Sequence, residues 1–419
     1  MRSWNLRWVT GGLLVGFLGA LSNTGSSAIQ EPPVQESQQD EADMQRWFAN
    51  PYDFSQLPPL PDVVAPTHDE VEESLQRGIE FLLKTQRPDG SWGSHVTARD
   101  FEVFAPVPGA HLAFKAATTA LCTSALCECD NGDDPRIAES LERARSWFVS
   151  NLRRVKRADS VAIYNVWSHA YAIRALIRLR ARPGLAPEDV AELDELIRSQ
   201  MDFLDRYESV DGGWGYYDFE WGARKPTSSS ISFVNATGLI ALYEARLAGF
   251  SLNDRTVERA LAATRRQQRP DFSYLYGEYL KSRPMMEINF PGGSSARSQS
   301  CNLAMRLWGQ EEITDNVLKT WLIRLYVRNG WLDRGRKLPI PHESWMYVSG
   351  YFYYYGHYYA GQVIDILPAA ERAPYQDMLA RLMIDRQQPD GAWWDYPLYS
   401  YHKQYGTAYA LMALVRCRK

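Results

Sequence analysis

Two short stretches near the ends of the chain decide the fold, and they share the pattern Gln-x-x-Asp-Gly-x-Trp. They read Gln86-Arg87-Pro88-Asp89-Gly90-Ser91-Trp92 and Gln387-Gln388-Pro389-Asp390-Gly391-Ala392-Trp393. A third copy keeps Asp211 and Trp214 with Glu208 in place of Gln, and a worn copy keeps Gln268 and Asp271 but ends on Tyr274. Asn329-Gly330-Trp331 is the remnant of a fifth. We call this pattern the turn motif, and its recurrence indicates a repeat architecture.

Each copy of the turn motif lies between two kinds of helical pattern. Before it comes a charged amphipathic stretch, as in Val71, Leu75, Ile79 and Leu82, which fall on one helical stripe. Six such helices begin near Thr67, Pro135, Pro187, Asp254, Thr314 and Pro374. After it comes an apolar stretch rich in small residues, and the six of these are 116–126, 166–176, 233–242, 298–307, 354–364 and 405–414.

Twelve helices of two alternating textures predict an all-α (α/α)6 toroid of six helical hairpins over residues 67–419. The small-residue helices form the inner ring, because small side chains let helix backbones approach closely. An open solenoid is the structural alternative, but the similarity of the first and last motif copies favours closure. No period-2 alternation bounded by hairpin turns is present, which argues against a β architecture.

The residues of the turn motif are interpreted as structural staples. Its glycine permits positive φ at the end of the outer helix, and its Asp accepts from free N–H groups at the start of the next helix. Its Trp covers the seam between neighbouring hairpins. The staple residues are Gln86, Asp89, Trp92, Asp211, Trp214, Gln268, Asp271, Gln387, Asp390 and Trp393.

The chain begins with a targeting pattern. Arg2 and Arg7 precede the apolar run 9–21, and small residues near Ala28 offer a cleavage site, so residues 1–28 are predicted to be a signal peptide. An uncleaved N-terminal anchor is the alternative. Residues 29–66 are rich in Pro and acidic residues and predict a disordered or extended linker. We therefore expect an exported protein without a membrane span in its mature chain.

Composition and net charge limit the classes of partner that the chain is expected to bind. The 419 residues carry a formal net charge of -4, which argues against nucleic-acid binding because such proteins present a basic face. A small apolar or carbohydrate ligand remains compatible with it. No cofactor is evident, and the oligomeric state is left open. The five cysteines are read as buried thiols, and their disulfide state is also left open: Cys122, Cys127, Cys129, Cys301 and Cys417.

The turn motif resembles the QW repeat of squalene-hopene and oxidosqualene cyclases and the related repeats of protein prenyltransferase β subunits. The resemblance covers about residues 68–418 and implies the α/α-toroid fold. The acid motif Asp-x-Asp-Asp of the cyclases does not occur in this sequence, nor does the Asp-x-Cys pair of the prenyltransferase zinc site. The resemblance therefore implies a superfamily and leaves the reaction open.

Candidate cavity residues come from aligning the inner helices on their Ala-Leu pairs. The alignment places a polar residue at one equivalent position in all six, and we predict that this position faces the central cavity: Thr119, His169, Asn235, Ser300, His357 and Thr407. The aromatic stretch 342–359 adds Tyr351 and Tyr355 to the predicted lining. Such aromatic walls suit a carbocation, a sugar ring or simple packing.

Candidate catalytic groups are the carboxylates near these aromatic clusters. Glu343, Asp218, Glu220 and Asp395 are the candidates for general-acid work, with His357 as an acid–base partner. His342, His357 and His402 form a weak metal candidate, because their spacing matches no known ligand pattern, and we expect no metal.

Three functions remain open from the sequence. The first is an isoprenoid-handling toroid, either a cyclase-like enzyme or a lipid-binding relative. The second is a carbohydrate-active enzyme of the polysaccharide lyase or glycosidase kind, which uses similar toroids outside the cell. The third is a non-catalytic binding or scaffold toroid. The lining of the cavity distinguishes them, since each function needs different side chains there.

Overall fold

A computed structural model describes residues 52–98, 107–218, 225–227, 230–338, 347 and 350–418 of the chain. The predicted signal peptide, 1–28, lies outside the described residues. The described part is helical, and its α-helices are α2 His68–Thr85, α3 Pro108–Cys129, α4 Pro135–Asn151, α5 Asn165–Arg180, α6 Pro187–Tyr207, α7 Ser232–Leu247, α8 Asp254–Gln267, α9 Pro291–Leu307, α10 Asp315–Val327, α11 Asn329–Gly335, α12 Tyr353–Asp365, α13 Ala373–Ile384 and α14 His402–Leu414.

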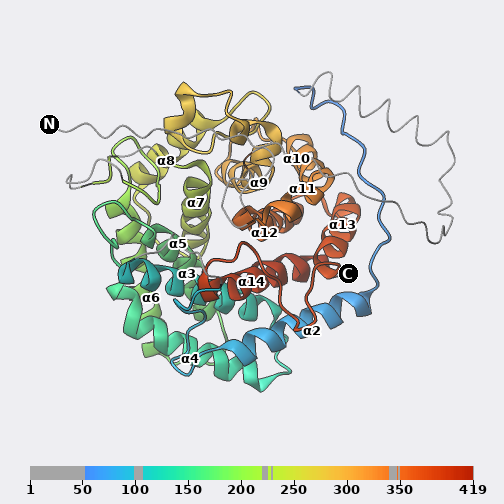
Figure 1. Ribbon diagram of the computed structural model, residues 1–419. Helices are drawn as coiled ribbons and strands as arrows, with labels where there is room; N and C mark the ends of the chain where they lie inside the picture. The colour runs from blue at the N-terminus through green and yellow to red at the C-terminus, as the bar shows by residue number, and fades with distance from the viewer. Residues whose placement is uncertain are drawn as a thin grey trace, which may run out of the picture.

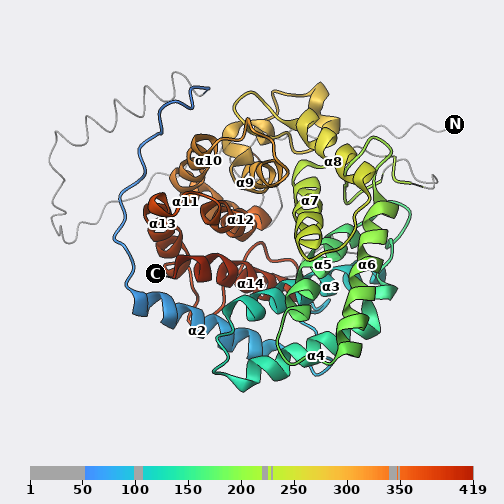
Figure 2. The same cartoon turned by 180° about the vertical axis from the view of Figure 1, so that it is seen from behind.

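The helices alternate between an outer and an inner ring (Figure 1). The inner ring is made of α3, α5, α7, α9, α12 and α14, each of which contacts the next. Contacts between α14 and α3 close this ring, and Figure 2 shows the same closure from behind. The prediction of a closed all-α toroid of six helical hairpins is confirmed, with α11 as an additional short helix.

Local sequence explains where the outer helices begin and which side they bury. At the start of α2, Glu70 N donates to Thr67 Oγ1 over 3.2 Å and Thr67 N donates to Glu70 Oε2 over 2.8 Å, which together form a capping box. Asp134 caps α4 in the same manner by accepting from Arg136 N. The apolar stripe of α2 is buried against the inner ring.

The turn motif joins each hairpin to the next one, and its last copy closes the ring. Gln387 Nε2 donates to Ser74 O of α2 over 2.9 Å. Gly391 has φ +85, and a Cβ atom there would lie 2.3 Å from Arg77 O on the same helix. Gln86 makes the equivalent bond, 2.8 Å to Ser140 O of α4. Glycine in the intact copies therefore allows both the positive φ and the close backbone approach, whereas the worn copy holds Phe272 at the same place with φ +56.

The Trp and Asp of the motif act within their own hairpin. The indole N–H groups of Trp92, Trp214 and Trp393 donate over 2.7–2.8 Å to carbonyl oxygens ten residues earlier, in the preceding outer helix. Asp89 accepts from Ser91 N over 3.0 Å, and it reaches the next helix through an ion pair with Lys115 at 3.7 Å and not through the free N–H groups at the start of that helix. The predicted role of Asp as a cap of the next helix is wrong, because the short side chain is satisfied by its own turn.

Two further observations concern the predicted linker and the remnant of the fifth motif. Phe54, inside the predicted linker, packs edge-on against Phe272 with ring centroids 5.1 Å apart, and Asn316 Nδ2 donates to Phe54 O over 3.0 Å. This end of the linker is therefore bound to the outer ring. The fifth motif remnant begins α11, and Trp331 is 47% exposed, so it does not staple a seam.

Candidate functional site: a blind aromatic cavity

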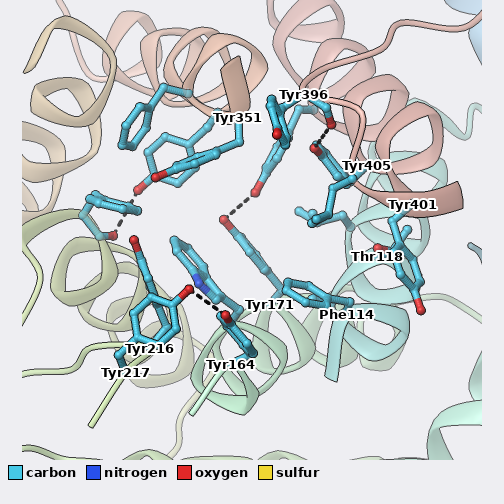
Figure 3. Close-up of a pocket in the computed structure, with 18 of the residues that line it drawn as sticks. Phe114, Thr118, Tyr164, Tyr171, Tyr216, Tyr217, Tyr351, Tyr396, Tyr401 and Tyr405 are labelled. Carbon is cyan, nitrogen blue, oxygen red and sulfur yellow. Dashed lines mark hydrogen bonds between the residues drawn. The ribbon is translucent and has the colours of Figure 1, made fainter. Parts of the chain in front are cut away.

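The ring encloses a cavity of about 370 Å³ at the N-terminal ends of the inner helices. Figure 3 shows its aromatic side chains converging from several helices. Eleven of its nineteen lining residues, within the described chain, are tyrosines. The lining is Phe114, Ala117, Thr118, Leu121, Tyr164, Trp167, Tyr171, Tyr216, Tyr217, Phe233, Tyr276, Tyr351, Phe352, Tyr355, Tyr396, Leu398, Tyr401, Tyr405 and Tyr409.

Helical spacing explains which inner-helix residues reach the cavity. Trp167 and Tyr171 on α5 are four residues apart, as are Tyr405 and Tyr409 on α14, and such pairs share one helix face. The structure places Tyr351 and Tyr355 on the same wall. For Trp167, Tyr171, Tyr355, Tyr405 and Tyr409, the sequence signal is an aromatic residue two places before or after the shared polar position of the inner helix.

The shared polar position itself faces the outer ring. Thr119 Oγ1 accepts from Trp92 N over 3.1 Å, Asn235 Oδ1 from Trp214 N over 2.6 Å, and Thr407 Oγ1 from Trp393 N over 3.0 Å. The prediction that Thr119, Asn235 and Thr407 line the cavity is wrong. Their polarity recurs because each satisfies the buried backbone N–H of a motif Trp.

The other three members of that position also lie behind the wall. His169 Nδ1 is 2.7 Å from Gln200 Oε1 of α6, and its ring stacks on Phe203. His357 Nδ1 is 2.7 Å from the carbonyl oxygen of Tyr353. Ser300 supports the wall from behind by accepting from the Tyr355 hydroxyl over 2.8 Å. None of these three residues lines the cavity, so the predicted lining is wrong for them as well.

The hydroxyl hydrogens of the lining are largely donated to other protein groups. Tyr164 OH donates to Tyr217 OH over 2.7 Å, and Tyr409 OH donates to Tyr171 OH over 2.5 Å (Figure 3). Two more phenols donate to backbone carbonyl oxygens: Tyr401 to His111 and Tyr405 to Tyr396. What the wall offers a ligand is therefore mostly ring faces and ring edges.

Several lining tyrosines are held in their neutral form by burial. Burial raises the pKa of Tyr171, Tyr355 and Tyr409 well above the ordinary phenol value. Burial also raises the pKa of Tyr401, at the side of the cavity. No Asp, Glu, Lys, Arg or His lines the cavity among the residues that the structure describes. The wall thus carries aromatic quadrupoles and no formal charge.

Ion pairs close the pore beyond the cavity floor. Below Tyr171 on α5, Arg174 donates to Glu244 Oε1 over 2.6 Å, and Arg178 donates to Glu244 Oε2 over 2.9 Å. Burial disfavours ionisation of Glu244, but the two arginines outweigh it and lower its pKa to about 2. Arg178 also pairs with Glu128 at 2.8 Å. The cavity therefore has one aromatic mouth and a charged, closed far end.

The predicted general acid Asp218 lies outside the lining of the cavity. Asp218 is buried and pairs with Arg157 at 2.9 Å, while Thr227 Oγ1 donates to it over 3.0 Å. Burial alone would raise the pKa of Asp218, but these bonds outweigh it and hold the pKa below its ordinary value. Such a carboxylate is a structural ion and a poor proton donor. Glu220 and Glu343 lie outside the described residues.

Asp395 is a second buried carboxyl next to a lining residue in the chain. It precedes the lining residue Tyr396 in the chain, and its Oδ2 accepts from Tyr354 N over 3.1 Å at the start of α12. Burial raises its pKa to about 7, although the N–H groups of Tyr396 and Tyr354 act in the opposite direction. Asp395 supports the wall and does not itself line the cavity.

The metal candidate is not assembled by the described residues. His342 lies outside them, and within them no group of three or more His, Cys, Asp or Glu is placed to hold a metal ion. His402 Nδ1 is 2.6 Å from Tyr399 O, so both His402 and His357 serve backbone carbonyls of their own hairpin. The five cysteines are free thiols, and all but Cys127 are buried.

The fold is similar to those of solved α/α-toroid structures. An unsaturated glucuronyl hydrolase from Streptococcus agalactiae has a TM-score of 0.53 at 12% identity, over 87% of this chain and 98% of that chain. The α-1,6-mannanase GH76A from Salegentibacter sp. HEL1_6 has a TM-score of 0.50 at 12% identity, over 83% and 98%. A type II terpene cyclase from Scytonema has a TM-score of 0.46 at 14% identity, over 84% and 98%.

These similarities are confined to the architecture. No family model and no curated relative matches the sequence. At 12–14% identity, a shared toroid carries no information about the reaction, because one fold hosts many functions. The chain is distantly similar in structure to α/α-toroid proteins that act on very different molecules, and the function has to be argued from the cavity.

Proposed function

We propose that the protein binds an isoprenoid chain, or another apolar ligand of similar width, in its aromatic cavity. One observation carries this proposal: the described lining is aromatic and uncharged, and it offers a ligand few hydroxyl groups that could donate a hydrogen bond. An apolar chain gains about 0.8 kcal/mol for each methylene group removed from water. The cavity of about 370 Å³ is within the usual size range of small-molecule sites.

The same lining disfavours an anionic ligand. A phosphate or carboxylate needs cations or several N–H donors to replace its water. The arginines nearest the floor, Arg174 and Arg178, are already paired with Glu244. A neutral ligand requires no such compensation, so a prenyl alcohol fits better than a prenyl diphosphate.

A carbohydrate-active enzyme is the second candidate, supported by the aromatic rings at the mouth on which a sugar could stack. Glycoside hydrolysis ordinarily needs two carboxyl groups, about 5 to 10 Å apart, facing the bond that breaks. The described lining contains no carboxyl group. An apolar ligand therefore explains more of the cavity than a sugar does.

The predicted signal peptide supports a location outside the cytoplasm, as part of this proposal. None of the helices among the described residues is both long and apolar enough to span a bilayer. Because the described wall holds no carboxyl group, the proposal concerns binding and assigns no catalytic step.

Native mass spectrometry tests this proposal. The purified chain is mixed with an equimolar set of prenyl alcohols and with an equimolar set of oligosaccharides, and the bound mass is read directly. We expect a single prenyl alcohol adduct that disappears when Ala117 on the cavity wall is replaced, Ala117→Phe. Retention of an oligosaccharide with no prenyl adduct would favour the second candidate, and the absence of any adduct would count against both.

A further inference from the structure

Thr118 presents a hydroxyl group to the cavity that has no partner among the residues that the structure describes. It lies on α3, is 3% exposed and belongs to the cavity wall. Within the described chain its Oγ1 atom makes no hydrogen bond, whereas the adjacent Thr119 accepts from Trp92 N over 3.1 Å. Two successive threonines of α3 therefore have different roles. Thr119 holds a turn motif, and Thr118 faces the cavity.

The phenols on the same side of the cavity already donate to the protein. Figure 3 shows Thr118 on the side where Tyr401 and Tyr405 lie. Tyr401 OH donates to His111 O over 3.2 Å, and Tyr405 OH donates to Tyr396 O over 2.9 Å. Both phenol hydrogens are engaged, so Thr118 is the group that keeps a hydroxyl hydrogen for a ligand on this part of the described wall.

Thr118 lies inside the cavity and away from its mouth. Phe114, one helical turn nearer the mouth end of α3, packs against Tyr401 with ring centroids 6.0 Å apart and against Tyr164 with centroids 5.0 Å apart. Leu121 lines the cavity almost one turn deeper than Thr118. A ligand oxygen at Thr118 is thus surrounded by rings and aliphatic groups, where a hydrogen bond is stronger than it is in water.

Two other polar groups show what distinguishes Thr118. The indole N–H of Trp167 also has no partner among the described residues, but Trp167 is partly exposed in the first turn of α5, where solvent can satisfy it. Thr123 Oγ1, also on α3, is buried without a hydrogen-bond partner, but Thr123 does not line the cavity. Thr118 combines burial, an unpartnered hydroxyl and access to the cavity.

The polar group of the ligand decides whether this hydroxyl contributes to binding. An alcohol or carbonyl oxygen loses its hydrogen bonds to water in an apolar cavity, and this loss opposes binding unless a protein group replaces those bonds. A threonine hydroxyl can donate to a carbonyl oxygen, and it can donate to an alcohol or accept from it. A hydrocarbon would leave Thr118 without a hydrogen bond.

We infer that Thr118 binds the oxygen atom of the ligand, so that the cavity selects apolar chains with a neutral hydroxyl or carbonyl group over hydrocarbons of the same shape. This inference rests on the proposed function, because it requires an apolar ligand in the cavity. The aromatic rings bind the chain, and the single hydrogen bond of Thr118 determines which chains are preferred.

Equilibrium binding of two matched ligands to the full-length protein tests the inference. The ligands are farnesol and its deoxy analogue, in which a hydrogen atom replaces the hydroxyl group. Thr118→Val keeps the shape of the side chain and removes its hydroxyl, so we expect it to weaken farnesol binding about fivefold to tenfold and to leave the analogue unaffected. Thr118→Ser keeps the hydroxyl and should keep the wild-type preference. Thr123→Val is the matched control on the same helix and should change neither affinity.

The possible outcomes separate this inference from the proposed function. Each ligand is compared with itself across the variants, so the difference in hydrophobicity between the two ligands cancels. Equal weakening of both ligands by Thr118→Val, or no weakening of either, would overturn the inference and leave the proposed function intact. Loss of the preference in Thr118→Ser would also contradict the inference. Failure of both ligands to bind wild type would overturn the proposed function and the inference with it.

Discussion

At the scale of single residues, one polar side chain on each inner helix explains how the turn motif is held. Thr407, on α14, accepts from the buried N–H of Trp393. Thr118, on the inner helix α3, lines the cavity instead. Alignment of the inner helices identifies the polar position, but it does not show whether the side chain points toward the cavity or toward the outer ring. An inner helix can direct a polar side chain either way. Hydrogen-bond partners in the folded chain decide it.

Replacing Thr407 by Val tests this assignment. Loss of the acceptor leaves the N–H of Trp393 unsatisfied, and we expect the free energy of unfolding to fall by about 1 to 3 kcal/mol. Affinity for a cavity ligand should be unchanged. Thr118→Val on the cavity wall is the control, with stability retained. Chemical denaturation of both variants measures this, and equal stabilities would contradict the assignment.

Asp395 makes the stability of the protein depend on pH. Burial raises the pKa of Asp395 to about 7, so between its unfolded value, 3.8, and that pKa the folded chain keeps a proton that the unfolded chain loses. Its contribution to stability therefore falls as pH rises through this window, by about 1.4 kcal/mol per pH unit. Burial lowers the pKa of His169 and His357 to about 4. Their contribution to stability therefore rises as pH increases from about 4 to 6.5.

The variant Asp395→Asn isolates this contribution. Its stability relative to wild type should increase as pH rises from 4.5 to 7 and then stay level, because Asn has no proton to lose. Urea denaturation of both proteins at several pH values gives the difference, from which the histidine contributions cancel. A difference that does not vary with pH would mean that Asp395 has an ordinary pKa.

At the scale of elements, the glycine of the three better-preserved turn motifs lies against the backbone of the next outer helix. Gly391 has φ +85 and faces Arg77 O of α2, whereas Gly132 has φ +86 with open space around it. The two glycines differ in their surroundings and share their backbone conformation. They therefore form a matched pair for measuring what ring closure contributes.

We expect Gly132→Ala to lower the free energy of unfolding by about 1 kcal/mol, because only the positive φ is unfavourable for alanine there. Gly391→Ala should cost clearly more, because its Cβ would meet Arg77 O at 2.3 Å and α2 would have to shift. Thermal unfolding of the two variants provides the comparison. Equal losses of stability would show that the last motif does not hold the first hairpin.

At the scale of the whole molecule, the repeat predicts the architecture well and the cavity poorly. Repeated motif copies, caps such as Thr67 and alternating helix textures set the order and the approximate starts of all six hairpins. The direction of side chains on the inner helices depends on how each helix is rotated in the ring. Since helices such as α14 bury almost every residue from Gly406 to Leu414, an apolar pattern does not reveal that rotation.

Closure of the pore is also a property of the whole ring. Arg174 and Glu244 come from different hairpins, 70 residues apart, and only the closed toroid brings them together below the cavity floor. Their separate sequence contexts give no sign of the pair. The central claim, an apolar cavity with one mouth, therefore depends on features that the motif does not encode.

The most direct test of that claim is equilibrium binding of a radiolabelled prenyl alcohol to wild type and to Ala117→Phe, in which an added ring occupies the cavity. Circular dichroism establishes that the variant is folded, and an oligosaccharide serves as the competing ligand. The account predicts saturable binding to wild type, at least about tenfold weaker binding to Ala117→Phe, and no competition by the oligosaccharide. Equal binding to both proteins, or displacement by the oligosaccharide, would contradict it.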